Sequence, residues 1–130
     1  MQEVYEFLKA NHTYYLATVE GDQPRVRPFG TVDIFEDKLY IQTGLKKNVA
    51  KQMLANGKVE ICCFGQGKWV RIAATAVLDE RIEAQEHMLQ SYESLRAQYT
   101  PGDGNTAVFY LKDATATFSS FTEPERVIKF

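Results

Sequence analysis

The stretch Leu39-Tyr-Ile-Gln-Thr-Gly-Leu-Lys-Lys-Asn-Val49 passes from a strand pattern into a helix pattern. Lys46 and Lys47 stand where the helix should begin, and Asn48 is the expected N-cap. Lysine is unfavourable there, because the free N–H groups and the helix dipole already make a helix N-terminus positive. A bound anion would explain both cations, since helix N-termini readily bind phosphate. With the hydroxyl of Thr43 nearby, the stretch predicts a phosphate-binding turn; the alternative is a solvated basic turn.

Strand patterns flank this stretch on both sides, and helix patterns are fewer. No strand–helix–strand rhythm repeats, and the Gly-x-Gly-x-x-Gly fingerprint is absent, so a Rossmann domain is not expected. Short strands at hairpin spacing predict a mainly β fold, a small β-barrel with inserted helices. The expected strands cover residues 14–20, 25–35, 39–43, 59–64, 68–78 and 106–121, the last as one strand or two. The expected helices run to Asn11, from Asn48 to about Asn56, and from Asp79 onward, the last with Met88, Tyr92, Leu95 and Tyr99 on one face.

Composition narrows the class of protein. A chain of 130 residues with 45% hydrophobic residues predicts one domain, 1–130, with a real core. The net charge of −2 argues against a nucleic-acid partner. The sequence has no secretory signal pattern and no apolar run of membrane-spanning length, so a soluble, cytoplasmic protein without a membrane partner is expected. Cys62 and Cys63 are adjacent and should point to opposite strand faces as reduced thiols.

A second candidate site lies in Arg25-Val-Arg-Pro-Phe-Gly30. Arg25 and Arg27 are two apart, so a strand places both on one face. Pro28 cannot donate to a sheet ladder and Gly30 packs nothing, which predicts a bulge or an exposed edge where a ligand approaches the backbone. A flat ring system whose polar edge bonds backbone groups fits such a strand. Two solvated arginines on an edge strand are the alternative.

Other candidate residues carry weaker signals. Trp69 and Arg71 share one strand face, and core packing is the alternative for Trp69. His12 and His87 have no second ligand at metal spacing, so no metal site is expected. No Ser-His-Asp or Cys-His arrangement has local support, and Ser119-Ser120 lacks a nucleophile-elbow context. The sequence therefore predicts no catalytic side chain.

Taken in order, these segments resemble the FMN-binding split-barrel family related to pyridoxamine 5′-phosphate oxidase. The similarity is greatest to its short, single-domain branch, which includes the 5-nitroimidazole reductase-like (Nim) proteins. It covers nearly the whole chain, and the ordered set of motifs carries it rather than any one of them. The motifs are Leu16-Ala-Thr-Val-Glu-Gly-Asp-Gln-Pro24, Arg27-Pro-Phe29, Leu39-Tyr-Ile-Gln-Thr43, Lys46-Lys-Asn-Val49, Gln52-Met-Leu-Ala-Asn56, Val59-Glu-Ile-Cys62 and Trp69-Val-Arg-Ile-Ala73.

The resemblance implies a split β-barrel that forms a homodimer with two FMN molecules at the subunit interface. It places one group of residues along the isoalloxazine, a second in the phosphate turn, and a third near the interface, where Arg71 reaches toward the flavin. Many members carry serine at the position of Lys46 and lysine at that of Asn48, so the turn differs in detail. The three groups are Arg27, Pro28, Phe29 and Gly30; Thr43, Lys46, Lys47 and Asn48; and Trp69 and Arg71, with the tail 118–121 approaching the partner's site.

The function expected from the resemblance is an FMN-dependent oxidoreductase. NAD(P)H would reduce the flavin, which would pass a hydride to a small acceptor such as a nitro-compound. Pyridoxamine-phosphate oxidase activity itself is not expected, because the C-terminal segment has few cations for a second phosphate. The alternative from another class is a non-enzymatic binder of flavin, haem or deazaflavin that serves as a carrier, store or sensor.

Overall fold

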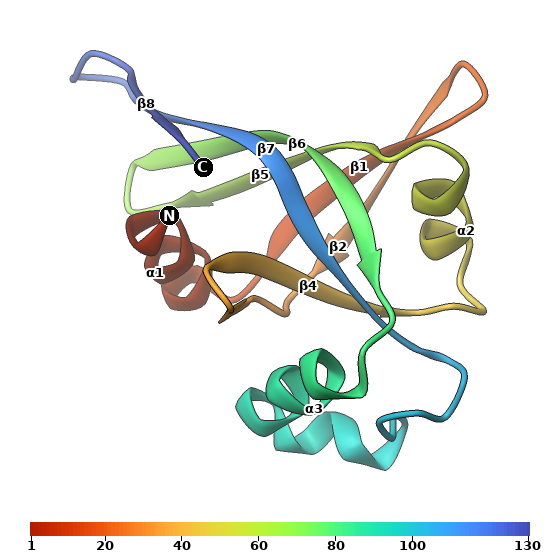
Figure 1. Ribbon diagram of the computed structural model, residues 1–130. Helices are drawn as coiled ribbons and strands as arrows, with labels where there is room; N and C mark the ends of the chain where they lie inside the picture. The colour runs from red at the N-terminus through yellow and green to blue at the C-terminus, as the bar shows by residue number, and fades with distance from the viewer.

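A curved antiparallel sheet forms the body of the protein (Figure 1). The computed structural model describes all residues, 1–130. Seven strands follow the order β2-β1-β5-β6-β7-β4-β3, and β8 pairs with β7. The strand bounds are β1 Tyr14–Glu20, β2 Gln23–Phe29, β3 Asp33–Phe35, β4 Lys38–Gly44, β5 Lys58–Gly65, β6 Lys68–Asp79, β7 Thr106–Ser120 and β8 Arg126–Lys129. The mainly β fold is confirmed, and the expected segment 106–121 is one long strand.

The sheet closes only partly, which makes it a split barrel. Strands β2 and β3 follow one another in the chain yet lie at opposite ends of the strand order. Short polar contacts join the two ends of the sheet. The Tyr14 hydroxyl donates to the Thr31 carbonyl at 2.5 Å, and the Gln42 backbone N–H donates to the Thr31 hydroxyl at 2.9 Å. This junction between the two edges borders the candidate site described below.

Three α-helices and one 3-10 helix cover the sheet. Helix α1 (Gln2–Asn11) packs near β5, helix α2 (Asn48–Ala55) near β1, β4 and β6, and helix α3 (Ile82–Ser91) near β3 and β7. The 3-10 helix η1 (Glu93–Ala97) follows α3 at the lower edge of the molecule in Figure 1. No helix is both long enough and apolar enough to span a membrane.

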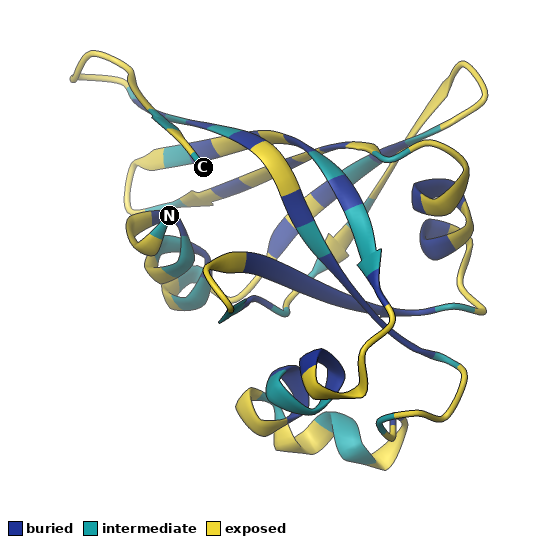
Figure 2. Ribbon diagram, in the orientation of Figure 1, coloured by how far each residue is buried: buried dark blue, intermediate teal, exposed yellow.

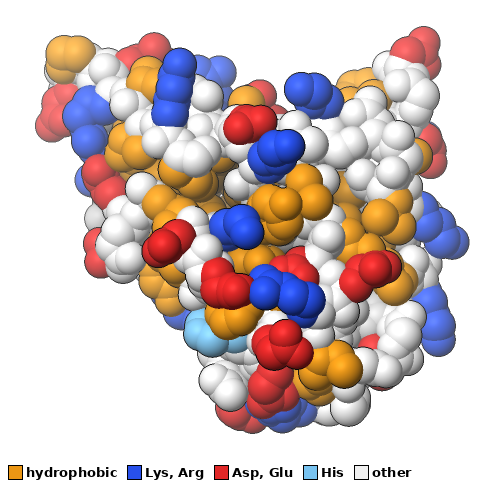
Figure 3. Space-filling model, viewed as in Figure 1, with side chains coloured by type: hydrophobic (Ala, Val, Ile, Leu, Met, Phe, Trp, Pro, Cys, Tyr) orange, Lys and Arg blue, Asp and Glu red, His pale blue; other side chains and the backbone are white.

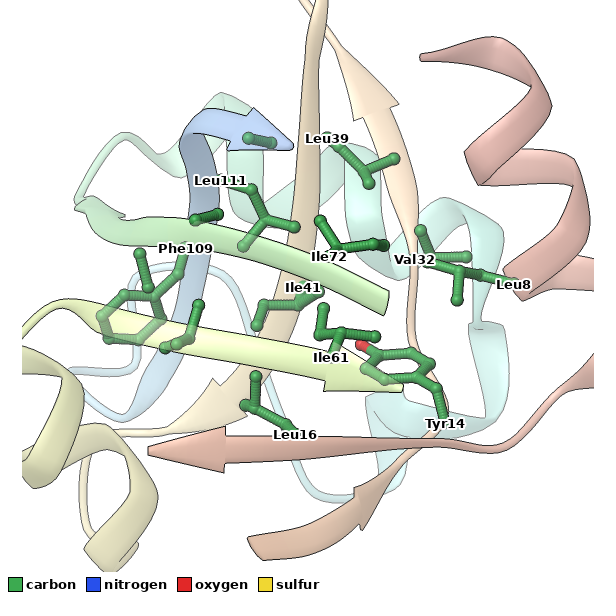
Figure 4. Packing of buried hydrophobic residues seen from close by; sticks show 14 of the residues in the cluster. Leu8, Tyr14, Leu16, Val32, Leu39, Ile41, Ile61, Ile72, Phe109 and Leu111 are labelled. Atoms are coloured by element: carbon green, nitrogen blue, oxygen red, sulfur yellow. The ribbon is translucent and has the colours of Figure 1, made fainter. Parts of the chain in front are cut away.

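The core lies inside the curved sheet and is sealed by α1 and α2. Figure 4 shows aliphatic side chains from several strands converging there, with Tyr14 and Phe109 at the margins. Strand β5 alternates cleanly, because every second side chain points inward. Cys63 is accordingly buried and Cys62 exposed, which confirms their predicted opposite orientations. Figure 2 shows the same contrast between buried strand centres and exposed hairpin tips.

Two predicted boundaries are wrong. The expected strand 25–35 is interrupted, because β2 ends at Phe29 and β3 begins only at Asp33. Residues 30–32 cross from one edge of the sheet to the other, and they belong to neither strand. Asp79 does not start a helix either; it ends β6, where its carboxylate binds the Arg81 guanidinium at 2.9 Å. The helix begins after that pair, at Ile82.

The expected helical face of Met88, Tyr92, Leu95 and Tyr99 is also broken. Helix α3 ends at Ser91, and Tyr92 leaves the helical region with φ −139° and ψ 66°. Its hydroxyl bonds both backbone groups of Val32, accepting from the N–H at 3.0 Å and donating to the carbonyl at 3.2 Å. The contact between Tyr92 and Val32 occurs where the helix ends. It places the segment after Tyr92 beside the ends of β2 and β4.

Candidate functional site

The candidate site is a cavity of about 270 Å³ where the end of β2, the end of β4, the start of α2 and the segment after α3 meet. Six of the predicted residues line it together. Its other lining residues come from the same four elements. The predicted group is Arg27, Pro28, Phe29, Gly30, Thr43 and Lys47, and the remainder are Thr31, Gln42, Val49, Leu95, Gln98 and Tyr99.

Arg27 is held by a network that reaches into α2. Its Nη1 donates to the Thr18 hydroxyl at 2.7 Å and to the Leu16 carbonyl at 3.2 Å. Its Nη2 donates to Oε1 of Gln52 at 2.6 Å, and the same oxygen accepts from Thr18 at 2.5 Å. Thr18 and Gln52 are both buried. The guanidinium is therefore fixed against the cavity wall by groups that cannot turn away to solvent.

The end of β2 matches its predicted role as an edge. Strand β2 is the last strand on its side of the sheet, and Pro28 pairs with Tyr15 of β1. A missing N–H is tolerated at an edge, because no further strand needs it. A side-chain carbon added at Gly30 would meet the His12 carbonyl oxygen at 3.4 Å, an ordinary contact. The protein itself thus does not require glycine at position 30, although an approaching ligand could.

The turn before α2 separates the two lysines. Both are exposed, but Lys47, the N-cap residue of α2, lines the cavity and Lys46 does not. Asn105 fixes the turn: its carbonyl accepts from the Leu45 N–H at 2.7 Å, and its side-chain oxygen accepts from the Lys46 N–H at 3.1 Å. Of the two lysines, only Lys47 therefore adds charge to this cavity.

Asn48 has a different place from the one expected. It is the first helical residue rather than the N-cap, and no side-chain bond caps the helix. It lines a neighbouring cavity with Glu20, Lys51 and Gln52. The expectation of an asparagine cap was wrong because the helix begins one residue earlier than the cap pattern indicates, with Lys47 in the N-cap position.

Trp69 and Arg71 lie on β6, outside the group that lines the cavity. Trp69 packs between Phe64 and Phe121, with ring centroids 6.4 and 5.2 Å away, and is not in the core. Arg71 is exposed and lies 3.9 Å from a Glu125 oxygen. Their contact with a flavin stays a prediction that needs a second subunit. The tail segment 118–121 ends on the same outer side, with Phe121 82% exposed.

The cavity is electropositive. Arg27 and Lys47 line it, and none of its twelve lining residues is acidic. Burial lowers the pKa of Arg27, and the nearby charge of Arg25 adds to that effect. An arginine stays protonated through such a shift, because its ordinary pKa lies above about 12. The arrangement suits an anionic ligand. Over the face drawn in Figure 3, by contrast, acidic and basic side chains are interspersed.

Several residues of the cavity were not predicted from the sequence. Gln42 is the most informative of them, because it is 6% exposed and its side-chain Nε2 and Oε1 have no hydrogen-bond partner. The available signal was a polar residue directly after the apolar run 39–41. Leu95 and Tyr99 were expected only as part of a helix face, and Gln98 was not predicted to have a role. They reach the cavity because the chain breaks at Tyr92, which no local pattern indicates.

His87 belongs to a structural contact rather than to the cavity. Its Nδ1 lies 2.6 Å from Oδ2 of Asp33, whose side chain is 4% exposed. Its ring also packs on Phe35 with centroids 4.8 Å apart. The pair joins α3 to β3. No cluster of three potential metal ligands is present in the structure.

The fold of the chain is similar to that of known proteins. A NimC/NimA family protein from Clostridium acetobutylicum is 40% identical, with a TM-score of 0.96 over 100% of this chain and 92% of that one. General Stress Protein 26 from Bacillus anthracis str. Sterne is 15% identical, with a TM-score of 0.74 over 99% and 97% of the two chains. At that identity the second likeness shows the fold alone.

No curated protein sequence matches the chain. The family model described as Pyridoxamine 5′-phosphate oxidase, in contrast, matches residues 1–120, which include every strand except β8 and every residue of the cavity. Together with the full-length similarity to the NimC/NimA family protein, this match shows that the chain belongs to the pyridoxamine 5′-phosphate oxidase family.

Proposed function

We propose that the protein binds FMN in the cavity beside Arg27 and Lys47 and acts as an oxidoreductase on a small molecule. The observation that carries the proposal is the composition of that cavity: two cations, no acidic residue, and the edge-strand segment 27–30 on one wall. A mononucleotide flavin has one anionic phosphate and one flat ring, so it needs one group of cations and one open edge.

The start of α2 suits the phosphate. Lys47 lines the cavity at the helix N-terminus, where the unpaired N–H groups also favour an anion. No acidic residue stands in the first turn to neutralise that end. The Thr43 hydroxyl at the end of β4 adds a neutral donor on the same wall. Lys46 and Asn48 have smaller roles in the proposed site, because neither lines this cavity.

The end of β2 suits the ring. Pro28 and Gly30 are exposed at this edge, and Gly30 adds no side chain that would block a ring. Arg27 is fixed beside it, and a fixed positive charge near a flavin ring stabilises negative charge that develops there on reduction. Bound FMN would supply the hydride chemistry. The protein's own groups would bind, orient and electrostatically tune it, with no side chain acting as a nucleophile.

A homodimer would complete the site. The outer face of the sheet exposes large apolar side chains, including Tyr15 at 53% and Phe64 at 61%. Trp69 and Arg71 lie on β6 beside this face, since Cys62 pairs with Arg71 and Phe64 with Trp69. An exposed apolar patch of this kind is typical of an interface. A second subunit on that face would cover the patch and bring Trp69 and Arg71 near a shared cofactor.

The decisive test is the cofactor of the native protein. An absorbance spectrum and the mass of the extracted cofactor should identify FMN, and the same spectrum would distinguish haem or a deazaflavin. NADH and NADPH oxidation should then be measured with a panel of acceptors that includes nitroaromatic compounds. A colourless protein that takes up no FMN on titration would refute the flavin proposal, and a flavoprotein inactive with every donor would refute the enzyme proposal alone.

A further inference from the structure

The carboxamide of Gln42 is the one buried polar side-chain group of the protein without a hydrogen-bond partner. Its Nε2 and Oε1 are both inaccessible to solvent and both unpaired. The residue is 6% exposed, lies on β4, and belongs to the wall of the candidate cavity. A buried amide without partners opposes folding, because it loses its bonds to water and gains none in return.

The backbone of Gln42 is held in place even though its side chain is unpaired. Its N–H donates to the Thr31 hydroxyl at 2.9 Å, and Thr31 is also a cavity residue, next to Gly30. Gln42 therefore lies at the strand junction that carries the open edge 27–30. Along the chain, Thr43 and the turn separate Gln42 from Lys47, which is on the proposed phosphate side. The nearest part of an FMN molecule bound as proposed is its ring.

We infer that Gln42 is a binding residue that recognises the imide edge of the flavin ring, an inference that rests on the proposed function. A carboxamide offers one acceptor and one donor side by side. The ring's imide edge offers the complement, an N–H at N3 flanked by carbonyl oxygens. Gln42 would accept from that N–H through Oε1 and donate to a carbonyl through Nε2. The carboxamide is less suited to the phosphate, because its oxygen can only accept and phosphate oxygens offer it no donor.

The experiment compares two ligands on two proteins. FMN and 3-methyl-FMN differ only at N3, where a methyl group replaces the N–H that would donate to Oε1. Gln42→Met replaces the carboxamide by an apolar side chain of similar length. Dissociation constants are measured by fluorescence titration of the ligand-free protein. Riboflavin and 3-methylriboflavin repeat the comparison without the phosphate. Gln90→Met is the matched control, because Gln90 is exposed on α3 and does not line the cavity.

The wild type and Gln90→Met should bind FMN about tenfold more tightly than 3-methyl-FMN, the factor for one unsatisfied buried group. Gln42→Met should bind FMN about tenfold more weakly than the wild type and should no longer distinguish the two flavins. The riboflavin pair should behave in the same way. Equal discrimination in the wild type and Gln42→Met, or none in either, would overturn the inference. Failure of the wild type to bind any flavin would instead overturn the proposed function.

A second measurement separates binding from a structural role. The ligand-free Gln42→Met protein should melt a few degrees higher than the wild type, because the substitution removes an unpaired buried amide. Gln42→Leu repeats the test should methionine pack poorly. A binding residue loses affinity while the ligand-free protein gains stability. If both variants melt lower than the wild type, the carboxamide has a partner within the protein and the inference is wrong.

Discussion

Nη2 of Arg27 donates a hydrogen bond to Oε1 of Gln52 at 2.6 Å, which joins the edge strand β2 to helix α2. The helix that begins with Lys47 thus also positions Arg27. Both cations of the cavity depend on α2: one stands at its N-terminus, and the other is bonded to its buried face. A displacement of this helix would move the two ends of the proposed flavin site together.

Replacing Arg27 tests the ring side of the site. Arg27→Ala should weaken FMN binding at least tenfold and lower the free energy of unfolding by about 1 kcal/mol, because Thr18 and Gln52 lose a charged partner. Arg25→Ala is the control, since Arg25 pairs only with exposed Glu20 and such pairs contribute little. Titration with FMN and urea unfolding measure the two effects. Equal losses in both variants would show that general surface charge, not the Arg27 network, governs binding.

The two lysines of the turn should differ. Lys47→Glu should abolish retention of flavin during purification, because it places a negative charge inside the cavity at the helix N-terminus. Lys46→Glu should retain it, with an affinity loss below about threefold, since that side chain lies outside the cavity and is screened by solvent. The ratio of flavin to protein absorbance reports the result. A yellow Lys47→Glu protein would place the phosphate elsewhere.

The proposed homodimer can be broken on the sheet face. Phe64→Glu puts a charge on the exposed apolar patch and should shift the molar mass from that of a dimer to about 15 kDa, with loss of bound flavin. Ile82→Glu replaces a similarly exposed hydrophobic residue at the start of α3 and should leave both properties unchanged. Light scattering gives the masses. A Phe64→Glu protein that stays dimeric would assign the interface to another surface.

Local patterns predicted most of the fold and half of the residues that line the candidate cavity. The hairpin spacing and the alternation of β5 follow from strand geometry, which short sequence stretches record well. The basic turn before α2, the proposed phosphate site, was predicted because two lysines at a helix start conflict with the helix dipole. Such a local conflict is visible without knowing the fold.

The missed features depend on contacts between distant segments. Tyr92 ends α3 at a position without glycine or proline while its hydroxyl bonds Val32, sixty residues away. The unpaired state of Gln42 becomes evident only once its surroundings are assembled. Gln52 shows the same limit, because a polar residue on a helix face does not indicate its partner until β1 and β2 pack against it.

The pair of Asp79 and Arg81 should make stability depend on pH. The bonded Arg81 guanidinium lowers the pKa of Asp79 from 3.8 to about 2. Because the folded pKa is depressed, the stabilisation is present above pH 4 and is lost as the pH falls toward 2. Asp79→Asn should therefore cost about 1–2 kcal/mol at pH 7 and progressively less at pH 4 and pH 3. Urea unfolding at these pH values measures the difference.

Glu36 provides the control for that pair. It also binds Arg81, at 2.6 Å, but its side chain is 45% exposed, so Glu36→Gln should cost less than about 0.5 kcal/mol at every pH. A cost for Asp79→Asn that does not change with pH would mean that lost packing or the bond to Tyr40 dominates. The negative charge of Asp79 would then contribute little to the free energy of unfolding.

The bridge from Tyr92 to Val32 should hold the cavity segment in place. Tyr92→Phe removes the hydroxyl that satisfies both backbone groups of a residue only 1% exposed, and should cost about 1–2 kcal/mol. Tyr110→Phe is the control, because the Tyr110 hydroxyl makes no hydrogen bond in the structure and its loss should be nearly neutral.

Hydrogen exchange distinguishes local from global loosening in Tyr92→Phe. Since η1 and the cavity residues Leu95, Gln98 and Tyr99 follow directly after Tyr92, their amides and that of Val32 should exchange faster. Amides of β5 and β6, in the middle of the sheet, should change only in proportion to the global free energy of unfolding. If the amides of the whole chain exchange faster to the same extent, the hydrogen bonds between Tyr92 and Val32 stabilise the whole fold and do not specifically order the cavity segment.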